Sequence, residues 1–373
     1  MTKKIVYIII AFPILLLQSS CHRSQIEERE PIQLGCAVQS VTTKSVISGK
    51  ESLVTESYNG STGFGVYGYK TVNTQATQVF NNTEVMPERD NVETDWYYSP
   101  IRYWDSNPEA SYQFAAYWPY MGTSADSGPY VSESNKVLSI HAIPNWQPSA
   151  DGKDILTADR RGKYRPIGEP FSSGKVSFQF SHLLSLVQFR AYYVGTQDRE
   201  VKITGLRLSA SDASHPVMSA SGTVEYTYPF GGQENSNPVL TAPTAAAQTD
   251  EIVLLGTPGV TLSQDSWYDE SQGATPPSTH PYEAVCSWFT APCTYWNSLK
   301  LDIDYTVDGA AMTGSAELTL TSTDGSTVYT GQTLSGHAYM VTLKLTAANG
   351  IELESIVMNE WNTVESTTSL YNW

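Results

Sequence analysis

Apolar and polar residues alternate in short runs along most of this chain, and turn-forming residues separate the runs. The first run lies at residues 31–41 and reads P-I-Q-L-G-C-A-V-Q-S-V. Three more in the first half read F-G-V-Y-G-Y-K, W-Y-Y-S-P-I-R-Y-W and Y-Q-F-A-A-Y-W-P-Y. Alternation with a period of two predicts half-buried β-strands, and the Gly, Pro, Asn and Asp residues between them predict turns.

The second half of the chain repeats this rhythm. Its strand patterns are V-K-I-T-G-L-R-L-S-A, E-I-V-L-L-G, Y-W-N-S-L-K-L-D-I-D-Y-T-V, A-E-L-T-L-T-S and H-A-Y-M-V-T-L-K-L-T-A. Long polar loops are expected at 228–250 and 266–280, and helical periodicity is confined to short pieces such as Asp154–Ala158. The pattern predicts an all-β fold of the sandwich or barrel type.

The length of 373 residues allows two domains with separate cores. The Pro-, Gly- and Ser-rich segment Tyr164–Gly174 leads into the apolar run V-S-F-Q-F-S-H-L-L-S-L-V-Q-F-R-A, which puts the expected boundary near residue 176. We therefore expect a first domain at 51–176 and a second domain at 177–373.

The N-terminus has the features of an export signal. Met1–Lys4 is basic, and Ile5–Leu17 is almost entirely apolar but too short to span a bilayer comfortably. Small residues before Cys21 resemble a bacterial lipobox, although Gln18 stands where Leu is most usual. We expect a signal peptide at 1–20 and a lipid on Cys21, with ordinary cleavage nearby as the alternative.

Composition narrows the classes of partner. The net charge is −16, which argues against nucleic acid because phosphate binding requires clustered Lys and Arg. Of the four cysteines, Cys286 and Cys293 either pair in an oxidising compartment or remain free buried thiols. The sequence has no Cys/His cluster that suggests a metal, and we expect no cofactor.

Catalytic motifs are absent from the sequence. It contains no GxSxG, GxxxxGK[ST] or HExxH pattern, and we expect no enzymatic activity. His182 lies within an apolar run and is expected to be structural. The aromatic residues between Trp96 and Trp104 could stack on sugars, but alternation along a strand would place about half of them in a core.

The end of the chain also has a strand-like pattern. Ile351–Trp361 begins with alternating apolar and polar residues, and 362–373 is polar, β-prone and closes on Trp373. A strand-like end with aromatic anchors can add to a sheet edge, either its own or that of a neighbour.

Five segments, which occur in a fixed order, carry a resemblance to a known family. They are D-W-Y-Y-S-P-I-R-Y-W with the following Y-Q-F-A-A-Y-W-P-Y, then D-I-L-T-A, F-S-H-L-L-S-L-V-Q-F, A-Y-M-V-T-L-K-L, and I-x-L-x-x-x-V-x-x-x-W at Ile351–Trp361. In this order they resemble the signature of the Bacteroidia fimbrillins, with Ser185 where that family usually has Ala. The terminal Asn372-Trp373 also resembles the pattern of shaft subunits.

The resemblance implies two tandem transthyretin-like Greek-key β-sandwiches that polymerise into adhesive surface fimbriae. It implies a precursor anchored in outer-membrane lipid through Cys21, from which a trypsin-like protease removes the first strand. The emptied groove would then accept a C-terminal strand from the next subunit, a contact that builds filaments. The implied partners are other fimbrial subunits, membrane lipid, the protease, and a host or bacterial surface glycan or protein.

Carried onto this chain, the resemblance implies that residues 21–50 are a tether and a propeptide, in which the removable first strand is about Pro31–Val41. Cleavage is expected after Lys44 or, as second choice, after Lys50, since this loop contains no Arg. The donor strand is expected within 362–373, and its side chains would be Val364, Leu370, Tyr371 and Trp373. Two alternatives are a monomeric glycan-binding surface lipoprotein and a β-sandwich hydrolase.

Overall fold

Nearly all regular structure in this protein is β-strand. The computed structural model describes residues 30–38, 63–87, 96–123, 130–142, 154–164, 168–171, 173–195, 199–210, 217–218, 224–229, 239–240, 248–249, 251–269, 271, 280–290, 299–318, 336–346 and 350–360. Within these ranges only short 3-10 pieces, such as η3 (Gln264–Ser266), accompany the strands, which confirms the all-β prediction. The described ranges contain no helix that is long and apolar enough to cross a membrane.

The first half of the chain builds a seven-stranded sheet. In spatial order its strands are β1 (Gln33–Val38), β9 (Lys175–His182), β8 (Leu156–Lys163), β5 (Ser111–Trp118), β2 (Phe64–Val72), β3 (Gln75–Pro87) and β4 (Trp96–Tyr97). β1 runs parallel to β9, whereas the other neighbours in the sheet are antiparallel.

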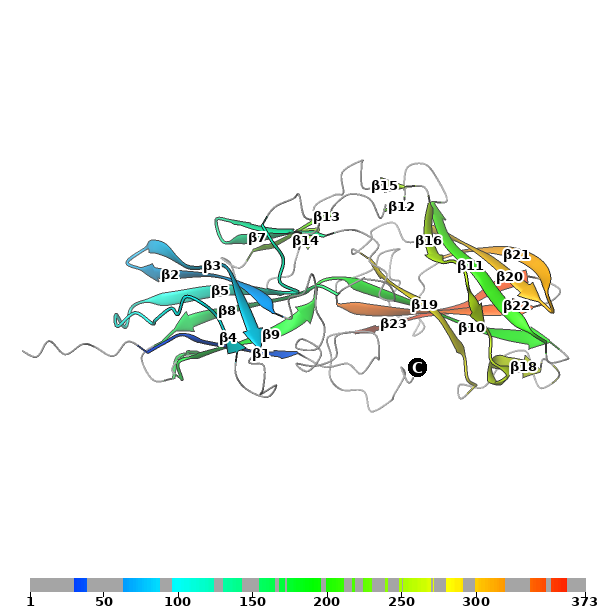
Figure 1. Cartoon of the computed structure of the whole chain (residues 1–373), viewed down its shortest axis with the longest axis horizontal. Coiled ribbons are helices and arrows are strands. Elements are labelled where there is room, and N and C mark those ends of the chain that lie inside the picture. The colour runs from blue at the N-terminus through cyan, green and yellow to red at the C-terminus, as the bar shows by residue number, and fades with distance from the viewer. Residues whose placement is uncertain are drawn as a thin grey trace, which may run out of the picture.

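This sheet curls until both of its arms enclose one core. The ring of Phe64 on β2 lies 5.9 Å from the ring of Phe178 and 5.5 Å from that of Phe180, both on β9. Phe114 of β5 packs edge-on against Phe80 of β3, and all five rings are buried in the same cluster. Figure 1 shows the result, with the edge strands β1 and β4 side by side at one end of an elongated molecule.

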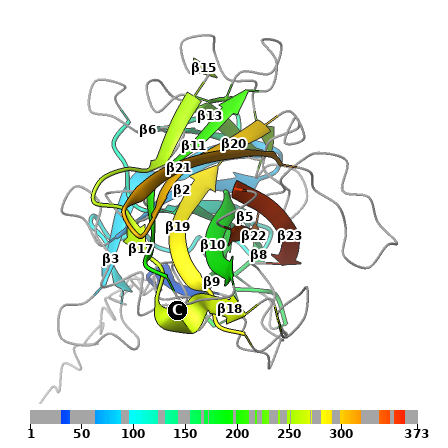
Figure 2. The ribbon, with the colours of Figure 1, turned by 90° about the vertical axis from the view of Figure 1, so that its right-hand side faces the viewer.

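The second half of the chain builds a sandwich of two sheets. One sheet has the order β18 (Trp267–Asp269), β10 (Ser185–Gly195), β22 (His337–Thr346), β23 (Gly350–Glu360), with β19 (Glu283–Thr290) also pairing with β10. The other has the order β16 (Glu251–Leu255), β11 (Val201–Ala210), β20 (Leu299–Val307), β21 (Ala310–Glu317), with β17 (Val260–Thr261) on β11. Alternate residues of both sheets, such as Val187, Leu206, Ile303 and Val341, meet in a second core. Figure 2 views the strands of this half of the chain from the right-hand side of Figure 1.

Two smaller sheets complete the described fold. One has the order β14 (Val239–Leu240), β13 (Val224–Pro229), β7 (Val137–Ala142), β6 (Tyr130–Ser134), and β12 (Val217–Met218) pairs with β15 (Gln248–Thr249). Glu133 of β6 accepts hydrogen bonds from Tyr69 and Gln78, so the β6–β7 hairpin lies against β2 and β3. Because β13 pairs with β7, a segment from the second half of the sequence packs beside the first sheet (Figure 1).

The structure corrects several strand assignments. The apolar run around residue 180 is not one strand. The chain leaves the first sheet after β9 and enters the two-sheet sandwich with β10. Residue 176, the expected domain boundary, therefore lies inside β9. The segment 228–250, expected to be a loop, contains β14 and β15. The pattern at 96–104 gives only the two-residue β4, since the chain bends at Ser99 and Pro100.

Candidate functional site

The candidate site is the place that β1 occupies in the first sheet, between β9 and the chain at Arg102–Trp104, which we call the seat of β1. β1 lies at the outer edge of β9, with Leu34 opposite Val176 and Val38 opposite Phe180. Alternation along 31–41 predicted a strand here, and β1 confirms it over Gln33–Val38. The backbone of β1 thus pairs with groups of β9 that would otherwise form an open strand edge.

The residues just before β1 bind the opposite arm of the curled sheet. The N–H of Ile32 donates to the carbonyl of Arg102 at 2.9 Å, and the N–H of Trp104 donates to the carbonyl of Glu30 at 3.0 Å. The hydroxyl of Tyr98 donates to the carbonyl of Ile32 at 2.6 Å, and burial raises the pKa of Tyr98, which keeps this donor protonated. Residues 30–32 and β1 together therefore bridge β9 and the chain after β4.

Two side chains of this segment enter the first core. Ile32 and Leu34 are only 1% and 3% exposed, and the intervening Gln33 points to solvent. Complete burial of an aliphatic side chain of this size stabilises a fold by about 1.5–3 kcal/mol. The seat of β1 therefore combines a paired backbone edge with two apolar pockets at alternate positions.

A polar anchor holds the start of the segment. The hydroxyl of Tyr164 donates to the carboxylate of Glu30, and the Tyr164 ring stacks on Trp104 at 4.9 Å with an interplanar angle of 7°. The indole N–H of Trp104 donates to the carbonyl of Gly174 at 3.1 Å. Gly174 has a φ of +77°, and a Cβ there would collide with the Glu30 carboxylate, so the turn requires glycine.

A second buried polar contact lies where the chain leaves this sheet. Nδ1 of His182 contacts the carboxylate of Asp154, and both side chains are 1% exposed. Burial raises the pKa of the Asp154 carboxyl, and the adjacent imidazole partly offsets that rise. The pair joins the last residue of β9 to Asp154, just before β8. His182 is therefore buried and paired, as expected for a structural histidine.

All residues predicted for lipidation, cleavage and donation lie outside the described residues, as does Cys293 of the predicted disulfide. The first group is Cys21, Lys44, Lys50, Val364, Leu370, Tyr371 and Trp373. Cys286 of β19 is a half-buried free cysteine in the described part of the chain, and burial raises the pKa of its thiol to about 12. Its pairing with Cys293 stays a prediction. Across the described ranges, His, Cys, Asp and Glu side chains form no group of three that could hold a metal ion.

The aromatic residues at 96–104 divide between the core and the surface. Tyr98 and Trp104 are buried, and Trp96 packs against the core. Tyr97 and Tyr103 are 46% and 52% exposed. About half of these rings therefore serve the core, as the alternation indicated.

The sequence alone does not predict the polar anchor. No local pattern identifies the Glu30–Tyr164 contact, because its partners are 134 positions apart in the sequence. The glycine in Ser173-Gly174 was the available signal of a tight turn.

A comparison with protein families decides the class of this protein. A family model described as fimbrillin-like matches residues 53–276, which is more than half of the chain. The chain belongs to the fimbrillin-like family. The resemblance to fimbrillins is thereby confirmed, and three of the five segments lie within the matched range.

Solved structures that resemble this chain include a fimbrial protein and a cell adhesion protein. The fimbrillin is similar to a fimbrial protein from Bacteroides vulgatus, with 16% identity, a TM-score of 0.55, and coverage of 89% of this chain and 99% of that one. It also aligns with a candidate cell adhesion protein from Bacteroides uniformis, with 16% identity, a TM-score of 0.49, and coverage of 89% and 98%. At 16% identity, the similarity to the Bacteroides vulgatus protein shows a common fold. No curated protein sequence matches the chain.

Proposed function

We propose that this fimbrillin is a structural subunit of cell-surface fimbriae, which polymerises by protease-triggered donor-strand exchange and supports adhesion. The observation that carries the proposal is the position of β1. This strand fills a seat between two arms of the first sheet, and only residues 39–63 connect it to β2. A single cut in that connection leaves β1 held by noncovalent contacts alone.

The sequence of the connection supports cleavage there. Lys44 and Lys50 both lie between Val38, where β1 ends, and Phe64, where β2 begins. A trypsin-like protease cutting after either lysine would separate β1 from the body of the protein. Because Cys21 precedes β1, the same cut would release the subunit from its outer-membrane lipid.

The chemistry of the emptied seat matches the end of the chain. Without β1, the edge of β9 would be open and the pockets of Ile32 and Leu34 exposed. Within 362–373, Tyr371 and Trp373 are two positions apart, which is the spacing of Ile32 and Leu34. A strand from a second subunit would restore backbone pairing through its main chain and fill the pockets with alternate side chains.

The geometry of such a contact favours a filament. A donor at one end of the chain and an acceptor in the first sheet are different surfaces, so each subunit would offer one and receive the other. We also propose that the two cores correspond to two tandem transthyretin-like domains, in which the first accepts and the second donates.

Limited trypsin treatment of the purified precursor tests this function. We expect mass spectrometry to detect cleavage after Lys44 or Lys50, non-boiled gels to show ladders, and negative-stain microscopy to show filaments. A Lys44→Gln, Lys50→Gln double variant and a variant lacking 362–373 should both stay monomeric while remaining folded. A trimmed wild-type protein that stays monomeric would contradict the proposal.

A further inference from the structure

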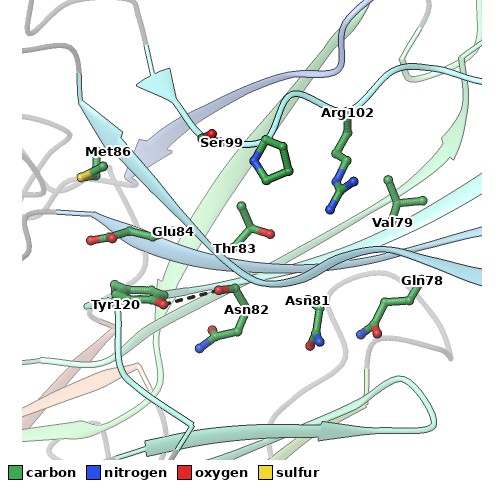
Figure 3. Close-up of a pocket in the computed structure, with 11 residues that line it drawn as sticks. Gln78, Val79, Asn81, Asn82, Thr83, Glu84, Met86, Ser99, Arg102 and Tyr120 are labelled. Atoms are coloured by element: carbon green, nitrogen blue, oxygen red, sulfur yellow. Dashed lines mark hydrogen bonds between the residues drawn. The ribbon is translucent and has the colours of Figure 1, made fainter.

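A polar hollow lies beside β3, at the arm of the first sheet opposite β9. It has a volume of about 470 Å³ and is bounded by residues 78–86 of β3, the turn at 99–102, and Tyr120. In Figure 3, Arg102, Ser99 and Thr83 lie on one side of the β3 ribbon, and Gln78, Asn81 and Asn82 lie on the other. The hollow therefore straddles the edge of the strand.

This edge of β3 is open because β4 is short. β4 pairs with β3 only at Met86 and Pro87, so residues 78–84 have no strand neighbour on that side in the described part of the chain. The edge is not a flat template for another strand, because a bulge places Asn81 and Asn82 opposite the single residue Tyr67. Bulges of this kind end regular pairing and change the direction of side chains.

The floor of the hollow is fixed by its own hydrogen bonds. Asn82 has a φ of +44°, in the left-handed region that Asn adopts more readily than most residues, and its side chain makes further contacts there. Its amide N–H donates to the carbonyl of Met121 at 3.0 Å, and its amide oxygen accepts from Tyr117. The hydroxyl of Tyr120 lies 3.5 Å from the carbonyl of Asn82. Such prior organisation lowers the entropy cost of binding a ligand.

The other residues that line the hollow provide hydrogen-bonding groups, and their formal charges sum to zero. The side chains of Asn81, Thr83 and Ser99 provide amide and hydroxyl groups that donate and accept. Arg102 contributes one positive charge and Glu84 one negative charge, so the formal charges cancel. This balance fits a neutral ligand with many hydroxyl groups better than it fits an anion or a cation.

One exposed aromatic ring contacts a residue that lines the hollow. Tyr97 is 46% exposed, and its hydroxyl lies 3.6 Å from the sulfur of Met86, which lines the hollow. Sugar rings combine hydroxyl edges with apolar C–H faces, so they bind where planar polar groups and an exposed ring occur together. The volume falls in the range of small-molecule sites.

We propose that this hollow binds a neutral saccharide. Asn81 and Arg102 donate to its hydroxyl oxygens, Thr83 and Ser99 exchange hydrogen bonds with it, and Tyr97 covers one face. The site does not depend on polymerisation, because it is formed in the precursor that still carries β1.

The test uses the purified, uncleaved precursor, so that loss of polymerisation cannot affect the result. Saturation-transfer NMR and titration calorimetry are carried out with neutral oligosaccharides of glucose, galactose, mannose and N-acetylglucosamine. A sialylated oligosaccharide and an extended Ala/Thr peptide serve as competing classes. We expect at least one neutral oligosaccharide to bind with a dissociation constant on the order of 1 mM or lower.

Substitutions locate the binding to the hollow. Asn81→Ala and Arg102→Met should each weaken binding about tenfold, the effect of one good hydrogen bond. Thr77→Ala, an exposed position of β3 outside the hollow, should bind as wild type does. The proposal is overturned if no neutral oligosaccharide binds, if only the sialylated ligand or the peptide binds, or if the two variants retain full affinity.

Discussion

At the scale of residues, two kinds of interaction form the seat of β1. One kind comes from apolar side chains at alternate positions of the sequence, and the other from contacts between residues far apart in the sequence. Ile32 and Leu34 enter the core as their period of two predicts. The contacts of Glu30 with Tyr164, and of Asp154 with His182, join positions far apart in the chain. Local propensity contains no information about such partners, so the sequence identified the strand and not its anchor.

A tyrosine in the same core should make the free energy of unfolding depend on pH in the alkaline range. Tyr112 is buried, its hydroxyl accepts a hydrogen bond from the N–H of Asp105 at 2.7 Å, and burial raises its pKa to about 12. Below pH 10 the tyrosine is protonated in both the folded and the unfolded state. Between pH 10 and 12 only the unfolded state ionises, so the free energy of unfolding should fall as pH rises.

Urea denaturation of wild type and Tyr112→Phe at pH 9 to 12 checks this prediction. We expect the variant to be less stable by about 1 kcal/mol at pH 9, because Asp105 loses a hydrogen-bond acceptor. The variant should then lose less stability than wild type as pH rises to 12. Parallel curves would show that Tyr112 does not titrate as proposed.

At the scale of elements, the sequence predicted most strands but not their sheets. Leu183 and Leu184 are buried like their neighbours, so the run containing β9 and β10 has no exposed residue where the chain changes sheets. The turn there is fixed by non-local bonds, such as that from the N–H of Leu183 to the carbonyl of Ile155 at 2.8 Å. Likewise, nothing local to β13 indicates that it pairs with β7.

The contribution of β1 to the precursor can be measured with a matched pair of variants. Leu34→Ala removes a side chain that fills the core, and should lower the free energy of unfolding by about 2–5 kcal/mol. Gln33→Ala changes the exposed neighbour and should stay within about 0.5 kcal/mol of wild type. Chemical denaturation of the uncleaved proteins gives both values.

The same variants distinguish a removable strand from a permanent one. After trypsin treatment and release of β1, filaments of Leu34→Ala, Gln33→Ala and wild type should have equal stability. If Leu34→Ala weakens the filament as much as the precursor, residue 34 is still part of the assembled subunit and β1 has not left.

At the scale of the whole molecule, the fimbrillin is an elongated pair of cores with β1 at one end (Figure 1). Arg102 lies between two features of that end, since its carbonyl accepts from Ile32 and its side chain lines the polar hollow. We propose that the seat of β1 serves assembly and that the hollow binds a saccharide. In this assembly the seat of β1 accepts the end of a neighbouring chain.

A binding measurement with a synthetic peptide tests that claim most directly. The protein is a variant lacking 362–373, compared before and after trypsin removes β1, and the ligand is a labelled peptide of residues 362–373. The account predicts saturable binding to the trimmed protein only, and loss of binding when the peptide carries Tyr371→Asp and Trp373→Asp. Equal binding to the untrimmed protein, or no binding to the trimmed one, would contradict it.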